Sequence, residues 1–323
     1  MRLFRHYDNL PPDARSGAVA IGNFDGVHLG HQAVIGEAGR IARSTGVPWS
    51  VLTLEPHPRS VFHPDAPPFR LTTFHAKARL IEAMGVDVMV VVPFNAEFAT
   101  LAAVRFVEEI LVHGLAARAV ISGHDFHFGR GREGHPDLLL ELGKTFDFDY
   151  TCVHEVKSPD GEPYSSTRIR DALRQGDLDR ANRLLGRPFE IEGRIVQGER
   201  RGRTIGYPTA NIALGDYIRP AFGVYAVGVA IEDGPWRNGI ANIGVRPSFG
   251  GTEPLLEAHL FDTDDDLYGR HARVRLCHYL RAEKRFDGLD GLKAQIAVDS
   301  ARARLLLADL TDAPRDSSQV SGT

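Results

Sequence analysis

The strongest constraint on the fold is an alternation of short apolar runs with amphipathic segments, which fills the first half of the chain and stops at Gly186-Arg187-Pro188. Ala18–Ile21 and Val86–Val92 have the length of strands, and the second is uninterrupted, which is typical of a strand buried on both faces. Further strands are expected over Ser50–Leu54, Ala119–Ser122 and Tyr150–Val156, and helices over His31–Ser44, from Thr72 or Thr73 to Met84, over Leu101–Val112 and over Pro136–Lys144. This βα order predicts an α/β domain with a doubly wound parallel sheet, whose ligands bind beyond the carboxyl ends of the strands.

The pattern of the second half is different. Two short helices, Thr167–Gln175 and Leu178–Leu185, precede the break, and after it strands follow one another without a long helix between them. These strands are expected over Phe189–Val196, Gly223–Ile231, Asn238–Ile243, Leu255–Phe261 and His271–Leu280. The order predicts a small antiparallel β-barrel with a terminal helix over Leu289–Leu310. We therefore expect domains over residues 1–186 and 187–310, and a flexible tail over residues 311–323.

Composition argues against a nucleic-acid-binding, disulfide-rich, secreted or membrane protein. A chain of 323 residues is long for a single core, and its net charge of -4 provides no basic field for nucleic acid. The two cysteines, Cys152 and Cys277, are far apart, which argues for a reducing compartment and against a disulfide framework. The polar start and the lack of 18 consecutive apolar residues argue against a signal peptide and a membrane span. We therefore expect a cytoplasmic protein that binds neither nucleic acid nor membrane.

The first group of unusual residues follows the first strand, in the run from Gly22 to His31. Its glycines allow a ligand to approach the backbone closely. His31 falls near the start of a helix, where free N–H groups and the helix dipole favour phosphate, and His28 lies three residues before it. Imidazoles placed there could donate hydrogen bonds to phosphate oxygens. Taken alone, the run is equally compatible with a glycine-rich turn carrying two surface histidines, or with half of a metal site.

Two further segments also fall at carboxyl ends of predicted strands. Glu55-Pro56-His57-Pro58 holds a histidine between two prolines, which a plain turn does not explain. The segment Gly123–Arg132 places Asp125, the rings of Phe126 and Phe128, and two arginines in one loop. A flexible basic surface loop is the alternative for this segment, but it leaves the aromatic residues unexplained.

The fourth segment, Ser165–Arg170, opens a helix. Serine and threonine are common helix N-caps, so capping is a strong alternative to a binding role. Capping predicts an acidic or Gln partner three residues later, whereas the sequence places Arg168, Ile169 and Arg170 there. Two arginines in a first turn oppose the helix dipole by about 0.3–1 kcal/mol each, and a bound anion would reverse that cost. We interpret the segment as a phosphate- or pyrophosphate-binding site.

In this order, the four segments resemble the nucleotidyltransferase half of bacterial bifunctional riboflavin kinase/FAD synthetases, over about residues 15–185. The resemblance implies transfer of AMP from ATP to FMN with release of pyrophosphate. It assigns ATP or phosphate binding to Gly22, Phe24, Gly26, His28, His31, Ser166, Thr167, Arg168 and Arg170. It assigns flavin binding to His57, Asp125, Phe126 and Phe128, and Mg²⁺ binding to Asp125. Such a transfer needs alignment and charge neutralisation more than a covalent intermediate, so the lack of an obvious nucleophile is no objection.

The second group of unusual residues begins after the first strand of the second half. Glycines recur at Gly198, Gly202 and Gly206 with arginines between them, but the Gly-Lys-Ser/Thr of a Walker A loop is missing. A basic hairpin turn would explain this run, yet it does not explain Pro-Thr-Ala-Asn directly after it. Thr209 and Asn211 offer hard oxygen ligands that suit Mg²⁺ on ATP.

Glu257 lies in an otherwise apolar strand. In a regular strand Glu257 and His259 would face opposite to Ala258 and Leu260, so alternation alone leaves Glu257 as an ordinary solvent-facing residue.

Residues from about 187 to 306 resemble the riboflavin kinase module of the same family. The resemblance implies that Glu257 is the general base for the ribityl hydroxyl, and that Arg281 and Glu283 contact the flavin. It assigns ATP or Mg²⁺ binding to Gly198, Gly202, Arg203, Gly206, Thr209 and Asn211. One departure is Ser248, where the family has Thr, and the substitution keeps the hydroxyl.

We therefore predict a two-step enzyme that uses ATP and Mg²⁺ to convert riboflavin to FMN and FMN to FAD. One alternative is a riboflavin kinase with an inactive first domain, against which intact His28 and His31 argue. The other is a non-catalytic flavin-binding regulator, which would need a DNA-binding module that the sequence does not reveal. A weak homo-oligomer is left open.

Overall fold

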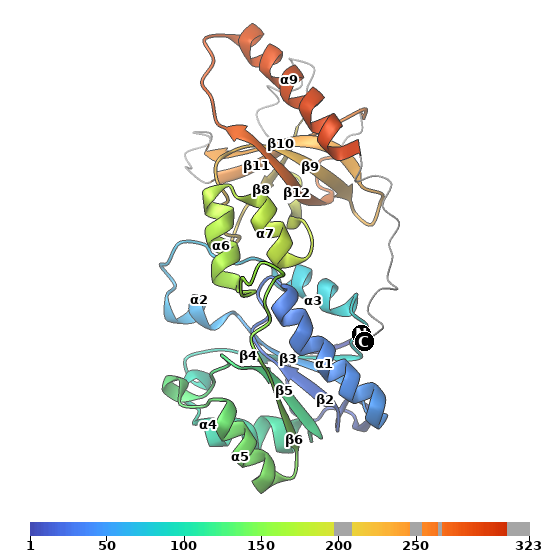
Figure 1. Cartoon of the computed structure of the whole chain (residues 1–323), viewed down its shortest axis with the longest axis vertical. Helices are drawn as coiled ribbons and strands as arrows, with labels where there is room; N and C mark the ends of the chain where they lie inside the picture. Colours follow the sequence, from blue (N-terminus) through green and yellow to red (C-terminus); the bar gives the residue numbers. More distant parts are fainter. Residues whose placement is uncertain (197–208, 246–253, 264–266, 309–323) are drawn as a thin grey trace. The chain divides into compact units, whose positions relative to one another are not determined.

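The computed structural model describes residues 1–196, 209–245, 254–263 and 267–308. They form two compact units. The first consists of Met1–Ser166 with Leu184–Gly186, and the second of Thr167–Arg183 and the chain from Arg187 onward. Figure 1 colours the chain along its sequence, so that each unit can be followed by itself.

The first unit is built on a six-stranded sheet in which every pairing is parallel. Its strands are β1 (Arg2–Phe4), β2 (Ala18–Ile21), β3 (Trp49–Glu55), β4 (Val88–Pro93), β5 (Ala119–Gly123) and β6 (Asp149–Val153), in the order β1-β4-β3-β2-β5-β6. Its helices are α1 (Leu29–Thr45), α2 (Pro58–Phe62), α3 (Phe74–Glu82), α4 (Ala103–Phe106), the π-helical segment η3 (Val107–Gly114) and α5 (Pro136–Phe146). The doubly wound parallel sheet predicted from the sequence is confirmed.

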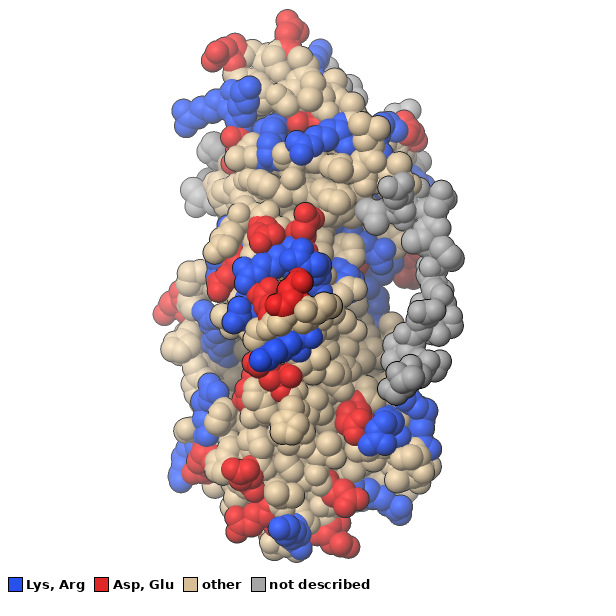
Figure 2. Space-filling view, in the orientation of Figure 1, with Lys and Arg blue, Asp and Glu red and all other residues tan. Residues whose placement is uncertain are grey.

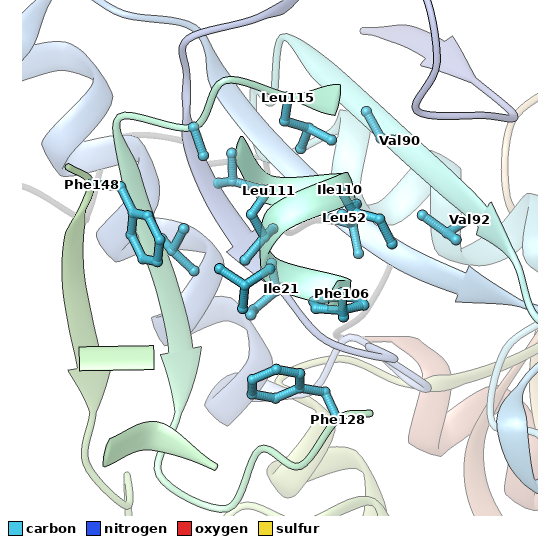
Figure 3. Close-up of a cluster of buried hydrophobic side chains, with 14 of the residues drawn as sticks. Ile21, Leu52, Val90, Val92, Phe106, Ile110, Leu111, Leu115, Phe128 and Phe148 are labelled. Carbon is cyan, nitrogen blue, oxygen red and sulfur yellow. The ribbon is translucent and has the colours of Figure 1, made fainter. Parts of the chain in front are cut away.

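The uninterrupted apolar run of β4 is explained by burial on both faces. Val90 and Val92 belong to a core cluster with residues of α4, η3 and α5, whereas Met89 and Val91 belong to a second cluster with residues of α1 and α3. Successive side chains of a strand point to opposite faces, so a strand between two helical layers must be apolar throughout. Figure 3 shows the first cluster, in which Ile110 and Leu111 of η3 pack against the sheet.

The strand order places a topological switch point at β2. Its neighbours are β3 on one side and β5 on the other, and the chain leaves β2 towards β3 and β4 before it returns to β5. The loops that follow β2 and β5 therefore diverge at the carboxyl edge of the sheet, where open α/β sheets bind their ligands. These two loops hold Gly22–His28 and Gly123–Arg132.

The second unit contains an antiparallel sheet. Its strands are β7 (Phe189–Arg194), β8 (Ala210–Ala213), β9 (Gly223–Ile231), β10 (Arg237–Val245), β11 (Pro254–Leu260) and β12 (His271–Ala282), in the order β7-β12-β9-β10-β11-β8. An isolated bridge between Val196 and Asn211 joins the chain after β7 to the edge strand β8, with a 2.9 Å hydrogen bond from Val196 N to Asn211 O. The sheet therefore closes on itself at this bridge, as the predicted barrel requires.

Three helices complete the second unit within the residues that the structure describes. The terminal helix α9 (Leu289–Leu307) packs Ala303 and Leu307 against Val224, Ala226 and other apolar residues of β9, β10 and β12. Helices α6 (Ser166–Gln175) and α7 (Leu178–Leu185) precede the barrel, and Asn182 of α7 donates a 3.0 Å hydrogen bond to the carbonyl of Leu276 in β12. Residues 167–183 thus group with the barrel, whereas the sequence places the functional boundary near Gly186. That boundary stays a prediction.

Six short elements of the described structure are absent from the sequence prediction, and three of them are the 3₁₀ turns Pro12–Ala14, Phe98–Thr100 and Arg130–Arg132. Strand β1 has three residues and pairs only with β4, β8 has four residues, and α2 has five. Elements this short carry too few residues to show a periodic pattern. In the described part of the chain, no helix is both long enough and apolar enough to cross a bilayer. Acidic and basic side chains are interspersed over the face drawn in Figure 2.

The first unit offers a direct test of this packing. Leu111 is fully buried in the cluster of Figure 3, whereas Leu140, on α5, is 48% exposed. Leu111→Ala should lower the free energy of unfolding by about 2–5 kcal/mol, because it removes buried methyl groups and leaves a cavity. Leu140→Ala is the matched control and should change stability far less. Urea denaturation of both variants measures the difference, and equal effects would contradict the assigned core.

Candidate active sites

His28 begins the first helix of the parallel-sheet unit. It is the N-cap of α1, and its Nδ1 accepts a 3.2 Å hydrogen bond from the backbone N–H of His31. An Nδ1 that accepts leaves the proton of a neutral imidazole on Nε2. The ring of His28 is buried and stacks on the ring of His31 at a centroid distance of 3.6 Å and an interplanar angle of 20°. The helix N-terminus and two imidazoles thus meet at one place, where a phosphate would be stabilised.

The backbone before this helix is strained. Phe24 has a φ of 50° and Val27 a φ of 42°, although both side chains are bulky. Such residues rarely adopt the left-handed region, and each costs on the order of 1–3 kcal/mol there. The result is a buried Phe24 ring that meets the His31 ring edge-on, with centroids 5.4 Å apart. Gly26 has a φ of 89°, and an added Cβ would lie 2.8 Å from a methyl of Leu71.

A buried carboxylate fastens this loop. Asp25 is 1% exposed and accepts hydrogen bonds from the backbone N–H groups of Leu71, at 3.0 Å, and Thr72, at 3.1 Å. The hydroxyl of Thr72 accepts a 3.0 Å hydrogen bond from Gly26 N. The hydroxyl of Ser166 donates a 2.9 Å hydrogen bond to the Asp25 carbonyl. The first and fourth of the predicted segments are therefore in contact.

The other residues of the fourth segment lie in the second unit. Thr167, Arg168 and Arg170 belong to the first turns of α6. Arg168 is exposed, whereas Arg170 is buried. Their predicted contact with phosphate stays a prediction.

The loop after β5 presents one carboxylate and one partly exposed ring. Asp125 is exposed, and Phe126 is half-buried and stacks on Phe128 with centroids 5.6 Å apart. Phe128 itself is 6% exposed and contacts Phe106 within the core cluster, as Figure 3 shows. Phe126 is therefore the ring that a planar ligand could reach, with Phe128 behind it.

His57 lies at the carboxyl end of a neighbouring strand. It is the N-cap of α2, where its Nδ1 accepts a 3.1 Å hydrogen bond from Arg59 N. Its ring contacts Phe69 edge-on, with centroids 5.1 Å apart.

Sequence reasoning missed a buried charge cluster beneath these loops. Lys77 in α3 is fully buried, and its Nζ lies 2.6 Å from Glu55 Oε1. Arg70 donates two hydrogen bonds to the same carboxylate, at 2.7 and 3.2 Å. Burial lowers the pKa of Lys77, and the charge of Glu55 opposes this shift without cancelling it. Burial alone would raise the pKa of Glu55, but the charges of Lys77 and Arg70 outweigh it and hold this pKa below its usual value. A signal was present, because Lys77 lies on the same face of its predicted helix as apolar Ile81, four residues later.

The barrel holds the second candidate site. Glu257 in β11 is directly opposite Asn211 in β8 on one side and Asn242 in β10 on the other. Residues directly opposite one another on neighbouring strands share a face, so the three side chains form a row across the sheet. Glu257 is 8% exposed and Asn211 4%, so Glu257 is not the solvent-facing residue that strand alternation alone would allow. A carboxylate buried in a row of amides is suited to accept a proton from a positioned alcohol.

A second carboxylate lies beside this row. The Nδ2 of Asn242 donates a 3.3 Å hydrogen bond to Glu283 Oε1. An added Cβ on Gly244 would lie only 2.0 Å from the same oxygen, so a side chain there would displace the Glu283 carboxylate. The guanidinium of Arg281 donates to both oxygens of Asp299 in α9, with the shortest distance 2.8 Å. Arg281 thus connects the end of β12 to the terminal helix.

The barrel site offers a cation the oxygen atoms of Thr and Asn side chains. It does not offer a cluster of acids and histidines among the described residues. Thr209 immediately precedes β8, and Asn211 lies within it. In the described part of the chain, no group of three or more His, Cys, Asp and Glu side chains could hold a metal. Four further predicted residues, Gly198, Gly202, Arg203 and Gly206, lie outside the described residues.

Comparisons with known proteins match two family models to successive parts of the chain. The FAD synthetase family model matches residues 10–168, and the riboflavin kinase model matches residues 185–307. The bifunctional riboflavin kinase/FMN adenylyltransferase of Escherichia coli K12 is 43% identical over 94% of this chain and 97% of that protein. Those of Haemophilus influenzae and Pseudomonas fluorescens are 41% and 43% identical, over 94% and 95% of this chain and 98% of each protein.

One solved structure is similar over nearly the whole chain. A Streptococcus pneumoniae protein described as a macrolide-efflux protein superimposes with a TM-score of 0.81 at 31% sequence identity, covering 94% of this chain and 98% of that one. The chain therefore belongs to the family of bifunctional riboflavin kinase/FMN adenylyltransferases.

Proposed function

We propose that this protein phosphorylates riboflavin to FMN in its barrel and adenylylates FMN to FAD at the carboxyl edge of its parallel sheet. One observation carries the proposal: a single chain holds both a stacked histidine pair at a helix N-terminus and a buried Glu257 between two asparagines. A kinase with an inactive first domain would not need the strained loop that holds His28 and His31. A non-catalytic regulator would not need a buried carboxylate at Glu257.

In the barrel, the carboxylate of Glu257 would accept the proton of the terminal ribityl hydroxyl. The alcohol oxygen would then form a bond to the γ-phosphorus of ATP, and the bond from that phosphorus to the β-γ bridging oxygen would break to release ADP. The amide of Asn242 restrains Glu283, and Asp299 restrains Arg281, so these side chains could orient the flavin beside Glu257. Fixed orientation of this kind lowers the entropic part of the barrier.

At the parallel sheet, a phosphate oxygen of FMN would form a bond to the α-phosphorus of ATP, and pyrophosphate would leave. Negative charge grows on the phosphate oxygens during this step. The N-terminus of α1, with the rings of His28 and His31, would stabilise that charge through preorganised donors and the helix dipole. Ser166, Thr167, Arg168 and Arg170 would hold further phosphate oxygens. Gly22, Phe24 and Gly26 shape the loop around ATP.

The isoalloxazine ring of FMN would lie against Phe126, which is the partly exposed ring of its loop. Phe128 supports Phe126 from the core, and His57 and Asp125 would contact the flavin from the neighbouring loops.

Mg²⁺ fits the donors of both sites, because each offers hard oxygen atoms of the kind that this ion prefers. Thr209 and Asn211 would hold it in the barrel, and Asp125 at the parallel sheet. Bound Mg²⁺ would neutralise phosphate charge. We place the protein in the cytoplasm, with riboflavin, FMN and ATP as its small-molecule partners. Its described cysteines, Cys152 and Cys277, are both free thiols, which fits a reducing compartment.

Glu257→Gln should lower the rate of riboflavin phosphorylation by about 10²–10⁴-fold, because an amide cannot act as the base. FMN adenylylation, measured on the same preparation, should stay near normal and serves as the internal control. Riboflavin affinity should also be retained, since proton transfer matters in the transition state. A variant that keeps most of its kinase rate would exclude Glu257 as the base.

His28→Ala combined with His31→Ala should lower the rate of FAD formation from FMN by about 10²–10³-fold, because preorganised donors to the phosphates are lost. Riboflavin phosphorylation should be unchanged. His63→Ala with His75→Ala is the matched control, since both histidines are exposed and belong to the same unit. Normal FAD synthesis by the His28 and His31 double variant would contradict the proposed nucleotide site.

A further inference from the structure

Four charged side chains meet beneath the loop that leads to His28. Asp25, Glu55, Arg70 and Lys77 supply two negative and two positive charges, and Asp25, Arg70 and Lys77 are each less than a tenth exposed. Charges taken out of water are unfavourable unless they are paired and hydrogen-bonded. A buried network of this kind is therefore a poor source of stability. Its role is better inferred from the backbone groups to which it is hydrogen-bonded.

Lys77 uses all three of its donors. Its Nζ lies 2.6 Å from Glu55 Oε1, 3.0 Å from the backbone carbonyl oxygen of Asn23 and 3.3 Å from Thr53 Oγ1. The ammonium group has three N–H donors, and these three oxygen atoms provide one acceptor for each of them. The Thr53 hydroxyl itself donates a 3.2 Å hydrogen bond to the same Asn23 carbonyl. Two donors from the interior therefore fix the orientation of this one carbonyl.

The Asn23 carbonyl belongs to the peptide that enters the strained part of the loop. The next residue, Phe24, has its φ held at 50°, and its ring meets the edge of the His31 ring. A bulky residue in this conformation persists only where the surroundings impose it. Rotation of the Asn23 peptide would release Phe24, and with it the surface against which His31 is packed.

The far end of the loop is fastened independently. Asp25 accepts hydrogen bonds from Leu71 N and Thr72 N, and Gly26 N donates to Thr72 Oγ1. Loss of Lys77 would therefore leave the second half of the loop anchored and free only the Asn23–Phe24 peptide. Its effect should be a local misplacement of the imidazoles and not a collapse of the unit.

We propose that Lys77 is a positioning residue for the adenylyl transfer, acting through the Asn23 carbonyl and Phe24 to hold His31 against His28. The ammonium group touches no substrate in this scheme. The ion pair with Glu55 holds the ammonium group in place, and the ammonium group in turn fixes the backbone at the phosphate site. The inference rests on the proposed FMN adenylyltransferase function of this unit.

The main test is a double variant of the full chain, Glu55→Gln with Lys77→Met. Removing both members of the pair keeps the cluster neutral, because Asp25 and Arg70 remain, and methionine fills the space of the lysine stem. The donor to the Asn23 carbonyl is lost. We expect kcat for FAD synthesis from FMN and ATP to fall about 10–100-fold, since small misplacements of binding groups can cost that much. KM for ATP should change far less than kcat, and riboflavin phosphorylation should keep its wild-type rate.

Two controls separate positioning from stability. Lys144→Met removes an exposed lysine from the same unit and should leave both activities unchanged. Rates of FAD synthesis are also compared at several temperatures below the unfolding transition of the double variant. A misplaced histidine pair lowers the ratio of variant to wild-type rate at every temperature, whereas partial unfolding lets the ratio return to one on cooling.

Thr53→Val keeps the proposal testable should the double variant fail to fold. It is nearly isosteric and removes both the second donor to the Asn23 carbonyl and one acceptor of the Lys77 ammonium, so FAD synthesis should fall several-fold while the kinase rate is kept. Normal kcat for FAD synthesis in a folded double variant, or in Thr53→Val when the double variant does not fold, would overturn the role of Lys77. Wild-type protein that makes FMN but no FAD would instead refute the function on which the proposal rests.

Discussion

The hydrogen bond from the Lys77 ammonium to the Asn23 carbonyl is the contact on which the geometry of the histidine pair in the first unit depends. Strand β2 ends in a loop whose bulky residues have positive φ, and that loop must deliver two imidazoles to the start of α1. The sheet and its helical layers place the two ends of the loop, but they do not hold the strained loop in one conformation. The paired charges buried beneath the loop hold it in that conformation, because moving them apart would leave charge unpaired in the interior.

The barrel positions its proposed catalytic base through the pairing of its strands. Glu257 is placed by strand register, between Asn211 and Asn242, and the bridge from Val196 to Asn211 fixes the edge strand that completes this row. Gly244 gives Glu283 the room to reach Asn242. Two different devices, a buried ion cluster and a closed ladder of backbone pairs, thus position the polar groups of the two sites.

Much of this could be predicted from the sequence, because the periodic segments are long. Runs such as that of β4 revealed burial on both faces, and Thr73 was confirmed as the N-cap of α3. The loops after β2 and β5 could be placed at the sheet edge, since the order of elements implies a switch point there. The burial of Lys77 had a signal on its helix face, but its partners could not be predicted, because they lie in separate segments that only folding brings together. Neither could the surroundings of Glu257, since alternation along one strand does not say which residues lie opposite it.

Complementation tests the central claim, that one chain carries two independent ATP-dependent sites. Glu257→Gln protein and the His28→Ala, His31→Ala protein are each incubated with riboflavin and Mg²⁺-ATP, separately and as a mixture, and FMN and FAD are separated by chromatography. The first variant alone should form little of either product, and the second alone should accumulate FMN. Their mixture should form FAD, because FMN released by one protein can be adenylylated by the other. A mixture that accumulates FMN without FAD would contradict the two-site account.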